Sequence, residues 1–159
     1  MHEDCFRIVD PARARLDPAA ALAHVCDPRY GGINMFVGRV RNQNRGRDVV
    51  GITYEIFEPL ALNVFRQIRR KLTGLVGSDV RLYMAHACGR LAVGDIAVVI
   101  AVGTIHRDEA FRACRSAIEQ LKHSAPIWKL EHYADGDSEW SEGCSLCGEQ
   151  PHGNEDAEP

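Results

Sequence analysis

The sequence has no long hydrophobic run, although 45% of its 159 residues are hydrophobic. A helix that crosses a bilayer needs about 20 consecutive apolar residues, and no stretch of this chain approaches that length. The first ten residues, MHEDCFRIVD, also lack the basic flank and the apolar segment of a secretory signal. We therefore expect a soluble cytoplasmic protein with no membrane partner.

Basic residues are missing from the C-terminal part of the chain. No lysine or arginine follows Lys129, and most of the 19 basic residues lie between Arg39 and Lys129. Segment 141–159 is acidic and rich in glycine, serine and proline, a composition typical of disorder. We predict one domain over residues 1–140, an acidic disordered tail over 141–159, and an anionic ligand on the basic body.

The six cysteines do not indicate a disulfide framework, because thiols of a cytoplasmic protein stay reduced. In the tail, Cys144, Cys147 and His152 have the spacing of three zinc-knuckle ligands, but Ala157 stands at the fourth place and cannot bind a metal. A closed structural zinc site needs four ligands. We therefore predict no metal site and no cofactor.

The order of the predicted elements indicates an α+β fold with a mostly antiparallel sheet and about three helices, not a regular βαβ alternation. Helices are predicted to begin near residues 18, 58 and 106. Asp17 can cap the first, and the third ends by Ser124 because Pro126 cannot continue it. We expect strand 31–40 to pair with strand 49–56, and strand 79–89 to be half-buried. The predicted strands cover residues 31–40, 49–56, 79–89, 96–104 and 127–133.

The third helix places cations beside its apolar side. On a helical wheel, one apolar stripe is predicted from Phe111, Cys114, Ile118 and Leu121. Two further residues, Arg107 and Lys122, fall within about 20 to 40° of the first residue of that stripe. Each cation alone is explained by its place in a terminal turn, where Lys122 also favours the helix C-terminus.

A second lysine follows the proline break. In strand 127–133 the alternation puts Trp128 on one side and Lys129 with Glu131 on the other. If Trp128 faces the core, Lys129 faces outward. The turn at Pro126 would then bring Lys122 and Lys129 to the rim of one pocket.

Other cations form two further groups. Arg39 and Arg41 share one face of a strand end, where guanidinium groups could bind a phosphate or could protect a sheet edge. His106 and Arg107 stand at a helix start, which favours an anion. Arg107 and Lys122 are about 22 Å apart along the helix. Either there are two anion sites, or the helix start of one subunit completes the site of another.

Three segments carry a family resemblance, and they are FVGRVRNQNRG, VGTIHRDEAF and LKHSAPIWKLE. At these separations they resemble the large, catalytic subunit of molybdopterin synthase over about residues 31–140. The resemblance implies an α/β hammerhead-type fold with added sheet. It also implies a homodimer of large subunits that carries a small ubiquitin-like subunit at each end, forming a heterotetramer.

The same resemblance implies a sulfurtransferase activity in molybdenum cofactor biosynthesis. The family converts cyclic pyranopterin monophosphate to molybdopterin by inserting two sulfurs from the thiocarboxylated C-terminus of the small subunit. Lys122 and Lys129 would be catalytic, orienting the sulfur donor, stabilising negative charge and moving protons. The substrate-binding residues would be Arg39, Val40, Arg41, His106, Arg107, Lys122, Lys129, Leu130 and Glu131.

One departure from the family lies in the tail. Relatives often supply an arginine after the tryptophan that corresponds to Trp140, whereas segment 141–159 has no basic residue. Either that contact is dispensable, or Arg45 and Arg47 substitute for it.

Two other functions are compatible with parts of the pattern. A scaffold that only captures a ubiquitin-like C-terminus would not need His106, Arg107 and Arg41. A nucleic-acid-binding module could use the arginines of residues 39–47, but no aromatic residues are interleaved with them and the chain carries a net charge of -3. The enzyme is the preferred interpretation, and nucleic acid is not an expected partner.

Overall fold

The structure is a computed structural model that describes residues 4–140. Within that range no helix is both long and apolar enough to span a bilayer. In chain order the elements are β1 (Cys5–Val9), α1 (Pro18–Val25), β2 (Gly32–Arg39), β3 (Gln43–Asn44), β4 (Arg47–Ile56), α2 (Glu58–Val76), β5 (Val80–Ala87), β6 (Gly89–Ala92), β7 (Ile96–Thr104), α3 (Arg107–Ser124), β8 (Ile127–Tyr133) and β9 (Ser138–Trp140).

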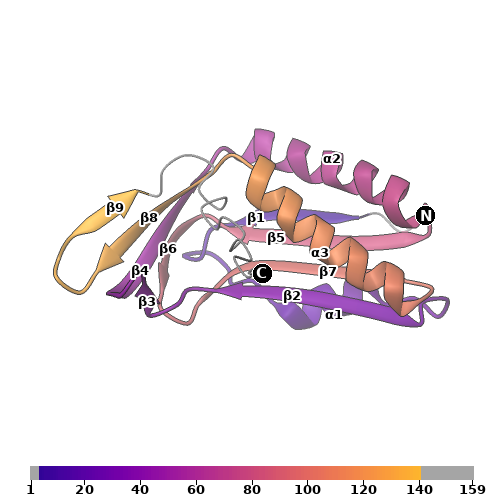
Figure 1. Cartoon of the computed structure of the whole chain (residues 1–159), viewed down its shortest axis with the longest axis horizontal. Coiled ribbons are helices and arrows are strands. Elements are labelled where there is room, and N and C mark those ends of the chain that lie inside the picture. Colours follow the sequence, from indigo (N-terminus) through magenta and orange to yellow (C-terminus); the bar gives the residue numbers. More distant parts are fainter. Residues whose placement is uncertain (1–3, 141–159) are drawn as a thin grey trace, which may run out of the picture.

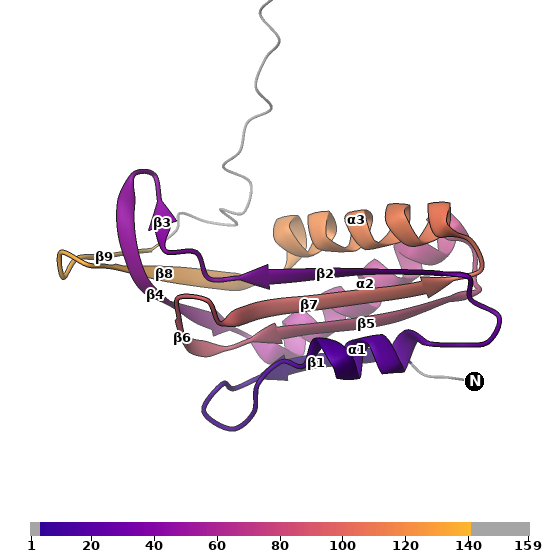
Figure 2. The ribbon, with the colours of Figure 1, turned by 90° about the horizontal axis from the view of Figure 1, so that it is seen from below.

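A four-stranded sheet in the order β1-β5-β7-β2 forms the body of the fold. Only β1 runs parallel to its neighbour β5, and the other pairs are antiparallel. Helices α2 and α3 cover one face of this sheet and α1 covers the other (Figures 1 and 2). The predicted α+β class with three helices is confirmed.

Strand β5 is buried on both faces, so the prediction that this strand is half-buried was wrong. Leu82 and Met84 point into the core beneath α2 and α3, whereas Tyr83 and Ala85 belong to the core beneath α1. The sequence pattern was misleading because the second face is aromatic or small at Tyr83, Ala85 and Ala87, and its charged residue, Arg81, is buried in an ion pair with Asp27. The short strand β1, which covers the edge of β5, was not predicted.

The helix starts follow the predicted local chemistry. The Asp17 side chain accepts a hydrogen bond of 2.8 Å from the backbone N–H of Ala19, and Pro18 occupies the first helical position. In α3, however, the buried face consists of Ala110, Ala113, Cys114, Ala117 and Leu121.

The predicted place of Phe111 in the buried stripe of α3 was wrong, because its side chain is 62% exposed. Small alanines let α3 lie close to the sheet, and they give a weaker hydrophobic signal than a phenylalanine does. Arg107, which was placed near Phe111 on the wheel, is likewise exposed.

A second sheet extends from the body and contains β3, β4, β8, β9 and β6. The predicted pairing of strand 31–40 with strand 49–56 was wrong, since β2 pairs with β7 while β4 pairs with β8, β6 and β3. The chain leaves the first sheet after Arg39 and forms a tight hairpin between β3 and β4. Arg45 (φ 49°) and Gly46 (φ 76°) form its two-residue turn, and such backbone angles match the twist of the flanking strands.

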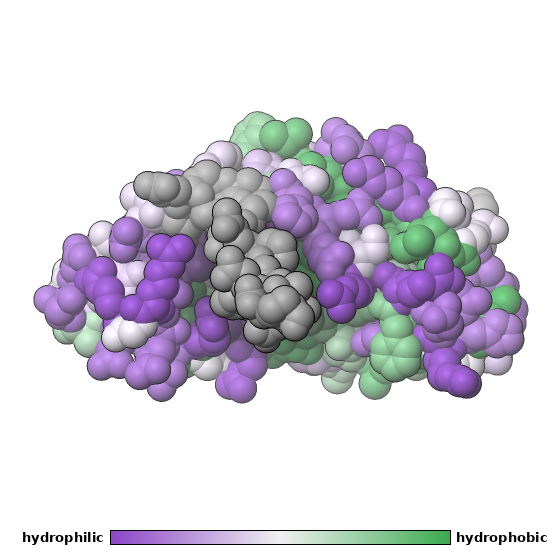
Figure 3. Space-filling view, viewed as in Figure 1, coloured by the Kyte–Doolittle hydropathy of each residue, from purple (hydrophilic) through white to green (hydrophobic). Residues whose placement is uncertain are grey.

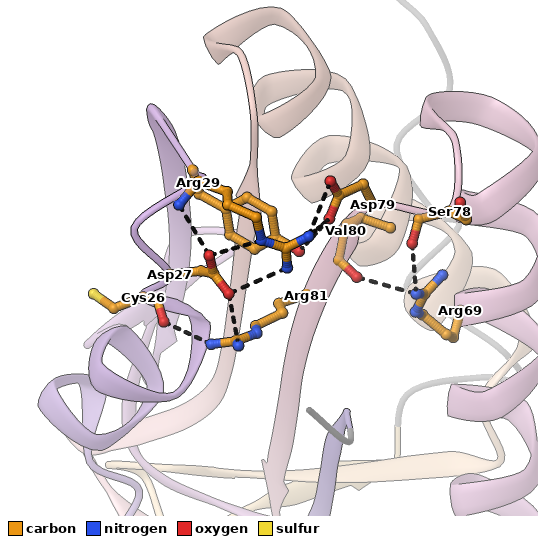
Figure 4. Close-up of polar contacts among 9 residues, drawn as sticks. Cys26, Asp27, Arg29, Arg69, Ser78, Asp79, Val80 and Arg81 are labelled. Carbon is orange, nitrogen blue, oxygen red and sulfur yellow. Dashed lines mark hydrogen bonds and ion pairs between the residues drawn. The ribbon is translucent and has the colours of Figure 1, made fainter. Parts of the chain in front are cut away.

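A charged cluster ties the end of α1 to the start of β5 (Figure 4). The guanidinium of Arg81 donates to the Asp27 carboxylate at 2.8 Å and to the Cys26 carbonyl at 2.6 Å. Both side chains of this ion pair are about nine-tenths buried. Arg29, which is exposed, binds the same carboxylate and lowers the pKa of Asp27 to about 2 through its hydrogen bonds.

Candidate functional site

A cavity of about 490 Å³ lies where the two sheets meet the C-terminal end of α3. Eight elements or connections contribute to its wall, and they come from distant parts of the sequence. Its charged and polar lining side chains include Arg39 (β2), Arg41 (the loop after β2), Asn44 (β3), Tyr54 (β4), His86 (β5), Lys122 (α3), Lys129 and Glu131 (β8). Five of these are residues of the predicted site.

The break at Pro126 brings the two lysines to this cavity. Helix α3 ends at Ser124, and β8 begins at Ile127. Lys122 lies in the last helical turn and Lys129 near the start of the strand, and both line the cavity. The sequence predicted this convergence.

The prediction assumed that Trp128 faces the core and Lys129 faces outward, and the structure shows the opposite orientation of β8. Trp128 is 45% exposed, whereas Ile127 and Glu131 are buried. Lys129 therefore lies on the inner face of the strand, and Trp128 lies on the outer face. The alternation was predicted, but the choice of the buried face requires the packing of β8 against α3 and β4.

Glu131 is a buried carboxylate at the centre of a polar network, with 4% of its surface exposed. Its Oε1 lies 2.7 Å from the Nζ of Lys129. Its Oε2 accepts hydrogen bonds from the hydroxyl of Tyr133 at 2.8 Å and from the amide of Asn44 at 2.5 Å. Burial acts to raise the pKa of Glu131, but these three donors outweigh it, so the pKa lies below its usual value.

Two other titratable side chains of the cavity are neutral at pH 7. Burial lowers the pKa of His86 to about 4, and its Nδ1 donates to the Ala87 carbonyl at 2.8 Å. Burial and the charge of Glu131 raise the pKa of Tyr54 to about 12. The two rings are in edge-on contact, with centroids 4.9 Å apart. Near neutral pH, charge in this wall therefore comes from the lysines, the arginines and Glu131.

The arginines of residues 39–47 do not form one basic stripe. Arg39 and Arg41 line the cavity, and the Nε of Arg39 donates to the Gly94 carbonyl at 2.9 Å. Arg47 instead contacts three carboxylates beside the β8–β9 turn and stacks on Tyr133, with its Cζ 3.6 Å from the ring centroid. These contacts count against Arg47 as a substitute for the missing tail arginine, and against a nucleic-acid-binding face.

Four predicted site residues lie outside this cavity wall. Val40 is 3% exposed and packs in the core beneath α1. Leu130 shares the outer side of β8 with Trp128. His106 and Arg107 are exposed at the opposite end of α3.

Asn44, Tyr54 and His86 line the candidate cavity but were not predicted. Asn44 stands in the polar RNQNRG segment, which signals a loop but not a contact with Glu131. Tyr54 and His86 lie within apolar strands, and there the sequence pattern predicts that a single polar residue belongs to the core.

A second cavity, of about 550 Å³, lies on the other side of Arg39. Its wall carries two carboxylates, Asp10 and Asp95, beside its arginines, and Arg15 lies 3.8 Å from Asp95. Apart from Arg39 it contains none of the predicted site residues. The cavity of the two lysines is therefore the candidate site.

Over residues 4–140, no group of three or more histidine, cysteine, aspartate or glutamate side chains is arranged to hold a metal ion. Cys144, Cys147 and His152 lie outside the described residues.

Comparison with known sequences gives a consistent set of relatives. The family model of the MoaE protein matches residues 12–124. A molybdopterin synthase catalytic subunit from Synechococcus elongatus is 52% identical over 134 residues, which cover 84% of this chain and 81% of the relative. Molybdopterin synthase catalytic subunit 1 of Mycobacterium tuberculosis is 43% identical over 75% of this chain and 80% of its own length.

Solved structures give the same result. The crystal structure of molybdopterin synthase from Staphylococcus aureus superposes with a TM-score of 0.79 at 31% identity, covering 87% of this chain and 98% of that one. A chain from a complex of subunits 1 and 2 of the molybdopterin-converting factor of Helicobacter pylori superposes with a TM-score of 0.70 at 26% identity, covering 86% and 90%.

Proposed function

The chain belongs to the MoaE family of molybdopterin synthase catalytic subunits, and from this premise we propose that its lysine cavity inserts sulfur into cyclic pyranopterin monophosphate. The family activity is that of a sulfurtransferase in molybdenum cofactor biosynthesis. The observation that carries the proposal is the meeting of Lys122, Lys129, Arg39 and Arg41 around one cavity.

The chemistry follows from the charges of the reactants. The phosphate of the pterin and the thiocarboxylate of the sulfur donor are both anions, so both need cations. Arg39 and Arg41 bind the phosphate or the pterin through their guanidinium groups. Lys122 and Lys129 orient the thiocarboxylate, stabilise negative charge on the reacting carbon and oxygen atoms, and move protons as oxygen leaves and sulfur adds.

The sulfur donor in this proposal is a small ubiquitin-like subunit. The Helicobacter pylori relative was solved as a complex of subunits 1 and 2 of the converting factor. We propose that this chain binds an equivalent small subunit, whose thiocarboxylated C-terminal tail enters the cavity beside Lys122. In this proposal the reaction takes place in the cytoplasm.

A second copy of this chain supplies His106 and Arg107 to the cavity. Helix α3 has 18 residues and is about 27 Å long, so its N-terminal residues are too far from Lys122 to share one small ligand within a subunit. The edge strand β2 offers a geometric solution. Arg107 packs against its first residue, since a Cβ placed on Gly32 would lie 2.9 Å from the Arg107 Cα, while Arg39 is its last residue.

Strand β2 has features of an edge that another strand covers. Among the strands of residues 4–140, its one neighbour is β7, on one side. Its residues 32–38 include no charge and no proline, the usual protections of a sheet edge, and Ile33 (39%) and Phe36 (37%) are exposed. Green apolar patches lie along the lower edge of Figure 3, where Figure 1 places β2 and α1.

Antiparallel pairing of two β2 strands about a two-fold axis would place the Gly32 end of one copy beside the Arg39 end of the other. His106 and Arg107 would then reach the cavity of the partner. The same pairing makes a symmetric homodimer, with one small subunit for each cavity.

Reconstitution tests the proposed activity. The purified chain is mixed with a thiocarboxylated small subunit and cyclic pyranopterin monophosphate, and the molybdopterin formed is measured. We expect product to form with consumption of two thiocarboxylates per pterin. Capture of the small subunit without any product would contradict the enzyme and would identify a scaffold.

A further inference from the structure

The two oxygens of the Glu131 carboxylate bind different donors, one of them charged and two of them neutral. Its Oε1 faces the ammonium group of Lys129, and its Oε2 accepts from Asn44 and Tyr133. A buried carboxylate needs such partners, because an unpaired charge in the core is costly. The two neutral donors therefore determine which oxygen remains for Lys129.

The two neutral donors are themselves anchored from different parts of the chain. Asn44 belongs to β3, on the connection that also carries Arg41. Tyr133 ends β8, is 6% exposed and lies beneath the guanidinium of Arg47. Arg47 in turn contacts carboxylates next to the β8–β9 turn, including Asp137 at 2.9 Å. Arg47 therefore holds the ring of Tyr133 in place, and the hydroxyl of that ring holds the Glu131 carboxylate.

We infer that Asn44 and Tyr133 are positioning residues for Lys129, which hold the Glu131 carboxylate so that a single oxygen keeps the ammonium group at the cavity wall. This inference rests on the proposed function, in which Lys129 is catalytic. Without these donors the carboxylate can turn and offer both oxygens to Lys129. A tighter ion pair then competes with the anionic substrate for the lysine.

Other ionisable groups near Glu131 must be considered when the effect of pH is measured. Tyr54 from β4, Lys122 from α3 and His86 from β5 share the cavity, and Glu139 lies opposite Glu131 in the β8–β9 register. Tyr54 titrates near pH 12 and His86 near pH 4. The pKa of Glu131 is also lowered, so the pH at which the acid limb lies does not by itself separate Glu131 from His86. Because Asn44→Ala and Tyr133→Phe remove donors to Glu131 and leave His86 in place, a difference between their acid limb and that of the wild type reports on Glu131.

The test compares Asn44→Ala and Tyr133→Phe with the wild-type chain in the reconstituted reaction. We expect kcat to fall about tenfold in each variant, since a hydrogen bond to a charged group is lost. KM for the pterin should change less than about twofold, because arginines bind the phosphate. Loss of either donor raises the pKa of Glu131, so the acid limb of the pH-rate profile should move to higher pH.

Tyr30→Phe is the matched control. The hydroxyl of Tyr30, which precedes β2, donates to the carboxylate of Asp79, which precedes β5, at 3.0 Å, and neither residue lines the cavity. Like Tyr133→Phe, the Tyr30→Phe substitution removes a hydrogen bond from a tyrosine hydroxyl to a carboxylate. It should leave kcat and the acid limb of the pH-rate profile unchanged. Thermal unfolding of all variants confirms that each is folded.

The outcomes separate this inference from the proposed function. Wild-type kcat and an unmoved acid limb in both Asn44→Ala and Tyr133→Phe, with an inactive Lys129→Ala, would overturn the inference alone. If activity falls equally at every pH and the acid limb of the pH-rate profile does not move, Asn44 and Tyr133 have a purely structural role. That result would also overturn the inference. A fully active Lys129→Ala would overturn the proposed function and the inference together.

Discussion

Mixing two inactive variants of this chain should restore about a quarter of wild-type activity. The variants are Arg107→Ala and Lys122→Ala, which remove cations from the two ends of α3. In the proposed dimer each cavity takes Lys122 from one subunit and Arg107 from its partner. A mixed dimer therefore has one intact cavity and one that lacks both cations.

The expected magnitude follows from random assembly. Equal amounts of the two variants give mixed dimers in about half of the population, and about half of their cavities are intact. The assay is co-expression of the two variants, followed by reconstitution with the thiocarboxylated small subunit and measurement of molybdopterin. Activity should rise to about a quarter of the wild-type value, far above either variant alone.

The control mixture combines Lys122→Ala with Lys129→Ala. Both lysines line the cavity of the same subunit, so every cavity in every dimer lacks one of them, and no activity should return. If the first mixture also stays inactive although mixed dimers form, His106 and Arg107 act within their own subunit or at a separate anion site, and the shared cavity is refuted.

Two further predictions concern stability. Between pH 4 and pH 6.5 His86 should contribute a rise of at most about 3 kcal/mol to the unfolding free energy, because the unfolded chain binds a proton there that His86, with its pKa lowered to about 4, does not. Chemical denaturation should show this contribution lost in His86→Gln and kept in His123→Gln. Arg81→Met should lower the Tm by on the order of 10 °C, because it leaves the buried carboxylate of Asp27 without its buried partner. The control is Arg29→Met, which removes an exposed arginine from the same carboxylate. A fall in Tm for Arg81→Met that is no larger than the fall for Arg29→Met would contradict the prediction.

Local signals predicted the parts of the fold that depend on neighbours in the chain. Asp17 and Pro18 marked the start of α1, and Pro126 marked the break between α3 and β8. The alternation of β8 then placed Lys129 and Glu131 on the same side of the strand. These features depend on backbone geometry and on residues a few positions apart, so a sequence can reveal them.

Strand pairing and helix orientation could not be predicted in the same way. β2 pairs with β7, more than fifty residues away, because two long apolar strands match in the core, whereas β4 follows it closely in sequence but joins another sheet. The helical wheel placed Phe111 on the buried side of α3, but the alanines of that helix pack against the sheet and Phe111 is exposed. Asn44 reaches Glu131 only through the β3–β4 turn, which the sequence indicates only as a polar loop.

The most direct test of the central claim is the turnover of Lys122→Ala and Lys129→Ala in the reconstituted reaction. Both lysines line the cavity, whereas Lys71, which is exposed on α2, provides a matched Lys71→Ala control. Molybdopterin formation should fall by about a hundredfold or more in each cavity variant. The control and Lys122→Ala should keep the wild-type Tm, and the control should also match the wild-type turnover. Lys129→Ala removes the charged partner of the buried Glu131, so its Tm should be lower, but all three variants should remain folded dimers. Near-wild-type turnover in both Lys122→Ala and Lys129→Ala would contradict the account.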